Sequence, residues 1–152
     1  MKRRKLAIIA LSAACVFAPA AAFADGQMTD HVNKTPEEVA VDGYDVVAYF
    51  TESKPVKGSP QYERKWRGAT WRFATAASRD AFARNPEKYT PQYGGFCAYG
   101  VSKGHESRID PNAWAIVGGK LYLNSSKAAC NRFKADKDSV RMGDENWSRM
   151  RK

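Results

Sequence analysis

Trp114-Ala-Ile-Val-Gly-Gly-Lys-Leu-Tyr-Leu-Asn124 is the stretch that decides the predicted fold. Two apolar runs flank Gly118-Gly119, and paired glycines accept the positive φ angles of a two-residue hairpin turn. A second hairpin is predicted over residues 61–74, where aromatic residues alternate with charged neighbours before Arg67-Gly68. Together the hairpins predict an α+β fold, a small single domain of antiparallel β-hairpins with short packed helices.

A short helix is predicted after each hairpin, because hydroxyl side chains that can cap a helix follow each returning strand. The candidate caps are Ser125 or Ser126 for a helix through Phe133, and Thr75 or Ser78 for a helix over residues 79–85. Pro86 lies near the end of the second of these helices or opens a further turn. A last short helix is expected to dock on the core through Trp147.

The region before the hairpins gives weaker signals. Residues 25–39 are polar and are predicted to form a flexible leader, with a single folded domain over residues 40–150. Thr35-Pro-Glu-Glu38 has the cap, proline and acids of a first helical turn. Asp45-Val-Val-Ala-Tyr-Phe50 is rich in β-branched and aromatic residues, which predicts a short strand. No internal repeat is detected.

The first residues predict export. Lys2-Arg-Arg-Lys5 precedes an apolar run over residues 6–17, and Ala22-Phe-Ala24 places small residues where a signal peptidase cleaves. Residues 1–24 are therefore predicted to be a cleaved signal peptide, and the protein is expected to be periplasmic or secreted. Lipidation at Cys15 is the alternative, but apolar sequence continues well past that residue.

Charge excludes some partners. The whole chain carries a formal charge of +9, and removal of residues 1–24 lowers it to about +5. The remaining basic residues are mixed with acids and form no basic run, so nucleic-acid binding is not expected. No stable membrane span is expected after signal cleavage, and the sequence predicts no oligomeric state.

A second informative stretch is Pro91-Gln-Tyr-Gly-Gly-Phe-Cys-Ala-Tyr-Gly-Val-Ser-Lys-Gly104, which places Cys97 in a turn rich in Gly and Tyr. Its glycines allow positive φ angles and close backbone approach. Tyr93, Phe96 and Tyr99 are expected to surround the thiol. A cysteine in this setting suggests a ligand or a redox centre, while the alternative is a small buried hydrophobe.

The combined pattern resembles the YHS-domain family, specifically its exported single-domain branch. The resemblance covers roughly residues 40–147. The blocks that carry it are residues 43–50, Gly58, Tyr62, residues 71–73, Phe82, residues 85–89, residues 91–101, Asp110-Pro111, Trp114 and residues 120–124.

This resemblance implies a small metal-associated module, because members of the family commonly carry paired cysteines thought to bind metal. The chain departs from that pattern, since Ala74 stands where a thiol is expected and no cysteine precedes it in the mature chain. In the exported branch the thiol is at Cys97. Related sequences sometimes carry selenocysteine there, which favours redox or soft-metal chemistry.

The first functional hypothesis is therefore a non-enzymatic protein that binds copper, or else zinc, for sequestration or handover to a metal-handling partner. Cys97 is the proposed ligand and His105 its nearest companion, since thiolate and imidazole suit both metals. A third ligand could come from Cys130, His31 or a methionine. An exposed loop position is the alternative interpretation of His105, whose spacing from Cys97 matches no known ligand motif.

Two other hypotheses remain open. The first is a periplasmic thiol-redox protein that uses Cys97, alone or with Cys130 as its resolving partner. The second is a non-catalytic interaction module whose cysteine is structural. The sequence does not decide whether the two thiols form a disulfide. Asp42 and Asp45 could act as paired carboxylates, but they are expected to accept backbone N–H bonds in a turn. No nucleophile elbow or phosphate loop is present.

Overall fold

A computed structural model describes residues 31–152. The predicted signal peptide and residues 25–30 of the predicted leader lie outside this range. The elements in the first half are η1 (Val41–Gly43), α1 (Ala48–Thr51), β1 (Ser59–Trp66), β2 (Ala69–Phe73), α2 (Ala76–Arg84) and α3 (Pro86–Tyr89). Those in the second half are η2 (Tyr93–Gly95), α4 (Ala98–Ser102), β3 (Asp110–Val117), β4 (Lys120–Asn124), α5 (Lys127–Ala135) and α6 (Ser139–Met150).

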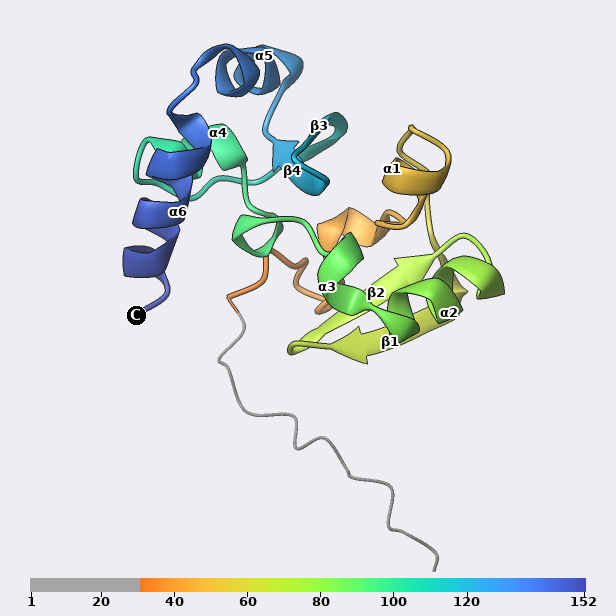
Figure 1. The fold of residues 1–152 in the computed structure, drawn as a ribbon. Coiled ribbons are helices and arrows are strands. Elements are labelled where there is room, and N and C mark those ends of the chain that lie inside the picture. Colours follow the sequence, from red (N-terminus) through yellow and green to blue (C-terminus); the bar gives the residue numbers. More distant parts are fainter. Residues whose placement is uncertain (1–30) are drawn as a thin grey trace, which may run out of the picture.

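The α+β prediction is confirmed. The strands form two antiparallel two-stranded sheets, β1–β2 and β3–β4, which lie in separate halves of the molecule (Figure 1). Both predicted turns are present, with positive φ at Arg67-Gly68 and at Gly118-Gly119, as two-residue hairpins require. No helix within residues 31–152 is long and apolar enough to cross a membrane.

Each helix that follows a hairpin is capped by one of its two predicted hydroxyl residues, although α2 begins at Ala76 and not at residue 79. Thr75 accepts a hydrogen bond from the backbone N–H of Ser78 and caps α2, which packs on β1–β2. Ser126 accepts one from Ala129 and caps α5, which packs on β3–β4. In α6, Trp147 packs on a cluster formed by side chains of the second half, as expected.

The two halves repeat one structural unit, which the sequence analysis did not detect. Each unit consists of a 3-10 turn, a short α-helix, a hairpin and a nine-residue helix. The second hairpin and its helix lie 51 positions after the first, from Ser59 to Asp110. Both hairpins also share one strand register and one irregularity early in the first strand. Figure 1 shows β1, β2 and α2 of the first unit at the lower right, and β3, β4 and α5 of the second unit in the upper part of the view.

Backbone hydrogen bonds outside the helices and strands repeat as well. In each unit the residue before the 3-10 turn bonds to the returning strand, and the second residue after the turn bonds to the loop before the hairpin. In the first unit these bonds are Ala40 N to Thr70 O (2.9 Å) and Asp45 N to Val56 O (2.9 Å). In the second they are Gln92 N to Leu121 O (2.8 Å) and Cys97 N to Ser107 O (3.1 Å).

Few side chains repeat, which explains why the duplication was missed. Because a backbone hydrogen bond does not depend on the identity of most side chains, the two units keep one path through different residues. The positions with the same residue in both units are Gly43 and Gly95, Pro60 and Pro111, Gly68 and Gly119, Ala77 and Ala128, and Phe82 and Phe133.

The prediction of a strand over residues 45–50 was wrong, because the helix α1 occupies part of this segment. The 3-10 turn η1 holds three successive residues at positive φ (52°, 49° and 78°), and η2 does the same (56°, 59° and 80°). This turn reverses the chain, and the Asp45 carboxylate then accepts the N–H groups of Val47 and Ala48. Those two bonds favour a helical start over an extended strand.

Residues 31–39 differ from the predicted flexible leader. Asn33 is buried and bonds to the turn η2, with its backbone N at 2.9 Å from Gly94 O and its Nδ2 at 3.0 Å from Gly95 O. The predicted helical turn at residues 35–38 is instead a hydrogen-bonded turn, after which Val39 pairs with Thr70. A polar residue of this segment, Asn33, therefore fixes it to the turn η2 through hydrogen bonds to backbone carbonyls.

Candidate thiol site

Cys97 lies at the centre of the second unit and is only 1% exposed. It is the N-cap residue of α4, and its Sγ accepts a hydrogen bond from the backbone N–H of Gly100 at 3.4 Å. A second N–H, that of Ser125, reaches the same sulfur at 3.2 Å from the end of the hairpin. Two donors from distant segments therefore converge on one thiol.

The remaining partners of the sulfur are polar. Ser125 Oγ lies 3.4 Å from it and Asn124 Oδ1 lies 3.9 Å from it. Asn124 is fully buried, and its Oδ1 also accepts the Tyr99 N–H at 3.1 Å, which fixes the orientation of the amide. The amide also lies near Cys130 and lowers the pKa of that thiol, but among the described residues its Nδ2 forms no hydrogen bond of ordinary geometry. Because a buried donor without an acceptor is costly, this amide marks an incomplete site.

Of the three aromatic residues predicted to surround Cys97, Tyr99 packs on the cluster that contains the thiol, while Tyr93 and Phe96 lie in the second cluster. The Phe96 ring stacks on His31, with centroids 5.2 Å apart, and lies near Trp147. The Tyr93 ring packs toward Tyr122 in the second cluster of the core. Cys97 itself belongs to the main hydrophobic cluster of the core, and its sulfur also contacts backbone N–H groups and the Asn124 and Ser125 side chains.

Asp45 occupies in the first unit the position that Cys97 occupies in the second. Its Oδ1 accepts the N–H of Val47 (2.9 Å) and of Ala48 (3.3 Å), and its Oδ2 accepts the N–H of Ala74 (2.9 Å). Asp45 is fully buried. The prediction that it satisfies backbone donors is confirmed.

The donors correspond one to one between the two units. Val47, Ala48 and Ala74 in the first unit correspond to Tyr99, Gly100 and Ser125 in the second. We call the three N–H groups of each unit the donor cradle. In the first unit the donor cradle holds a carboxylate, and in the second it faces a sulfur atom. Since Cys97 Sγ has no second acceptor atom, the Tyr99 N–H bonds to Asn124 instead.

Cys130 is the second buried thiol, 4% exposed, and the structure holds both cysteines as free thiols. Its Sγ donates to Trp114 O at 3.3 Å. Burial raises the pKa of the Cys130 thiol, and the nearby Cys97 adds to that effect, while Lys134 and Asn124 act in the opposite direction. Asn124 therefore lies beside both thiols.

The two histidines considered as companions of Cys97 form no hydrogen bond with it among the described residues. His105 is exposed on the loop after α4, and no hydrogen bond within residues 31–152 joins it to the thiol. His31 pairs with Glu106 at 2.5 Å. Over the same range, no group of three or more His, Cys, Asp and Glu side chains could hold a metal ion.

The loop over residues 103–108 lies against the helix that Cys97 caps. A Cβ atom at Gly100 would meet His105 O at 3.0 Å and Ser107 Oγ at 3.1 Å, so only glycine fits there without a shift. The loop is held at its surface by ion pairs from Lys103 to Asp136, Glu106 to His31 and Arg108 to Asp42. Ser125, on another side of the thiol, is exposed.

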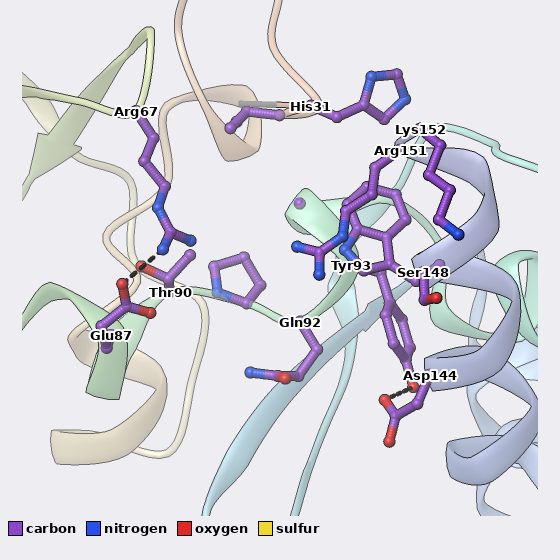
Figure 2. Close-up of a pocket in the computed structure, with 14 residues that line it drawn as sticks. His31, Arg67, Glu87, Thr90, Gln92, Tyr93, Asp144, Ser148, Arg151 and Lys152 are labelled. Atoms are coloured by element: carbon purple, nitrogen blue, oxygen red, sulfur yellow. Dashed lines mark hydrogen bonds and ion pairs between the residues drawn. The ribbon is translucent and has the colours of Figure 1, made fainter. Parts of the chain in front are cut away.

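A separate cleft of about 690 Å³ lies where the start of the Gly- and Tyr-rich stretch meets the end of α6. Figure 2 shows Arg67 and Arg151 on opposite sides of it, with Arg67 paired to Glu87 at 2.6 Å. Tyr93 lines its floor and donates to Asp144 at 3.0 Å, and burial followed by the Asp144 charge raises the Tyr93 pKa. The cleft is lined by Pro91–Gly94 and not by Cys97.

Comparison with known proteins gives this chain no relative: no family model, no curated protein and no solved structure matches it. Its function is therefore argued from the site alone.

Proposed function

We propose that this chain is an exported, periplasmic thiol-redox protein in which Cys97 is the reactive group. The observation that supports it is the convergence of two backbone N–H groups on Cys97 Sγ, at 3.2 and 3.4 Å from Ser125 and Gly100. Hydrogen bonds from N–H groups strengthen when their acceptor becomes negatively charged. This arrangement therefore suits a sulfur that carries negative charge while it reacts.

Burial limits the oxidant to a small molecule. Cys97 is almost fully covered, but its neighbour Ser125 is exposed, so the thiol lies just below the surface. Hydrogen peroxide is small and neutral and suits such a position. The thiolate attacks one peroxide oxygen, the O–O bond breaks, and sulfur is oxidised to sulfenic acid while the second oxygen leaves as hydroxide and takes up a proton.

The experiment exposes reduced mature protein, residues 25–152, to peroxide and traps sulfenic acid with dimedone. We expect a single adduct at Cys97 in wild type and in Cys130→Ser, and none in Cys97→Ser. Serine keeps an acceptor at the N-cap, so this variant should stay folded. If Cys97 takes up no oxidant while the protein is folded, a purely structural cysteine is the correct interpretation.

Binding of a soft metal, with copper ahead of zinc, is the second candidate. The observation that favours it is that both buried cysteines are free thiols with Asn124 beside each of them, because a soft cation neutralises two neighbouring thiolates. The resemblance to the YHS-domain family points the same way. A metal-handling partner would then receive the ion.

Competition with a Cu(I) chelator tests this second candidate. We expect one ion per chain, lost in Cys97→Ser and in Cys130→Ser. His105→Asn is the matched control, since His105 makes no bond to the thiol and its substitution should leave affinity unchanged. Equal affinity in all variants would reject the site.

A further inference from the structure

We infer that Cys97 is a site of oxidation to a stable sulfinate, which its donor cradle holds as the corresponding donor cradle holds the Asp45 carboxylate. This inference rests on the proposed reactivity of Cys97 toward peroxide. It goes further, because it names the oxidised form that the protein stabilises and the groups that stabilise it.

The first step is the match between the two acceptors. A sulfinate, like a carboxylate, presents two oxygens that share one negative charge. Asp45 places its two oxygens on three backbone N–H groups at 2.9, 3.3 and 2.9 Å. The second unit keeps all three donors, but only those of Gly100 and Ser125 meet the sulfur, which carries no oxygens, and the Tyr99 N–H bonds to Asn124.

The second step is the state of the site in the reduced protein. The N–H of Tyr99 bonds to Asn124 Oδ1, and Asn124 Nδ2 has no partner among the described residues although the side chain is fully buried. At the corresponding position of the first unit stands Phe73, which has no polar atom in its side chain. Asn124 is therefore an addition specific to the unit that carries the thiol.

Oxygens on Cys97 would complete this set. The amide of Asn124 presents Oδ1 to the sulfur at 3.9 Å, so half a turn of this amide would exchange Oδ1 for Nδ2, offer the unpartnered N–H groups to an oxygen on Cys97 and free the Tyr99 N–H. The Gly100 and Ser125 N–H groups already point to the sulfur. Four donors from two segments, residues 99–100 and 124–125, would then share two anionic oxygens, and the cost of burying an unpaired amide would be removed.

The chemistry balances with hydrogen peroxide as the only oxidant. The first peroxide converts the thiolate to sulfenate and leaves as water. The sulfenate sulfur then attacks an oxygen of a second peroxide, the O–O bond breaks, and a sulfinate and a second water result. Condensation with Cys130 would compete by forming a disulfide and releasing water, but Cys130 Sγ is held by Trp114 O.

Peroxide titration of the mature chain tests the inference directly. We expect intact-mass spectra to gain the mass of two oxygen atoms, peptide mapping to place both on Cys97, and the oxidised protein to melt at or above the temperature of the reduced one. A Cys97–Cys130 disulfide as the main product, or an oxidised protein that melts lower, would overturn it. If no oxygen is added to Cys97, the proposed function fails as well.

A substitution gives a test that needs no oxidant. Cys97→Asp places a carboxylate in the second donor cradle, as Asp45 does in the first, and we expect it to melt at or above the temperature of wild type. Cys130→Asp is the matched control, since Cys130 faces a backbone carbonyl, and it should melt much lower. If both variants lose similar stability, the donor cradle around Cys97 does not hold an anion and the inference is wrong.

Discussion

The two units of this molecule place different chemical groups at one position of a shared backbone. In the first unit a buried carboxylate, Asp45, uses three N–H donors. In the second, Cys97 uses two of the corresponding donors, and Asn124 takes the third. The difference indicates that the donor cradle belongs to the repeated backbone and not to the cysteine. The thiol therefore lies in surroundings that also suit a charged acceptor.

The left-handed turn before each donor cradle also differs in side chains. The middle residue is Asp42 in the first unit (φ 49°) and Gly94 in the second (φ 59°). Asp42 has room and pairs with Arg108 at 2.9 Å. Gly94 lies under the segment that begins at His31, where a side chain has no space. The turn of the second unit is thus closely packed at Gly94, whereas the turn of the first unit forms a surface ion pair at Asp42.

The largest effect is expected from removal of the carboxylate. Asp45→Ala leaves three buried N–H groups without an acceptor and should lower the free energy of unfolding by about 4 kcal/mol. Cys97→Ala removes a weaker sulfur acceptor and should cost about 1 kcal/mol. Denaturant unfolding of both variants measures the contrast. Equal losses would mean that the two donor cradles do not differ in strength.

A smaller effect is expected at the turns. Gly94→Ala places a Cβ at 2.0 Å from His31 O in a left-handed conformation, so we expect a loss of about 2 kcal/mol or more. Asp42→Gly, the matched change in the first unit, removes only an exposed ion pair and should change stability by roughly 0.5 kcal/mol. Thermal melting compares the two. A tolerated Gly94→Ala would show that residues 31–33 can move away from the turn.

The smallest expected effect is a change of the unfolding free energy with pH, caused by the Cys130 thiol. Because burial raises the Cys130 pKa, the folded protein keeps this proton at a pH where the unfolded chain has lost it. The unfolded state then binds fewer protons, so stability falls as pH rises above the ordinary thiol pKa, roughly 8.5. The difference in unfolding free energy between wild type and Cys130→Ala should follow this trend. A difference that is constant from neutral to alkaline pH would contradict it.

Several parts of the fold could be predicted because their signals are local. Paired glycines in one turn and Arg67-Gly68 in the other defined both hairpins, and Thr75 and Ser126 defined helix starts within a few residues of each cap. The helix α1 was missed because the carboxylate that starts it, Asp45, is held in place by a strand end at Ala74. That contact is invisible in a short window of sequence.

The candidate site was predicted in part. The Gly-rich turn correctly directed attention to Cys97, but His105 was chosen for its closeness in sequence and makes no bond to the thiol. Asn124 was missed, because nothing about an asparagine at the end of a strand indicates that it faces a cysteine 27 positions earlier. The repeated spacing of Gly43 and Gly95, Pro60 and Pro111, and Gly68 and Gly119 was the available signal for the duplication.

The sequence by itself determined the fold class, the two hairpins, the capped helices and the position of Cys97 in a Gly-rich turn. Each of these follows from residues that contact near neighbours in the chain. Only the tertiary structure decided that the two hairpin units are copies, that Cys97 corresponds to Asp45, and that Asn124 lies buried beside the sulfur without a partner for its Nδ2. Those relations depend on N–H groups and side chains brought together from distant segments, where packing sets the distances.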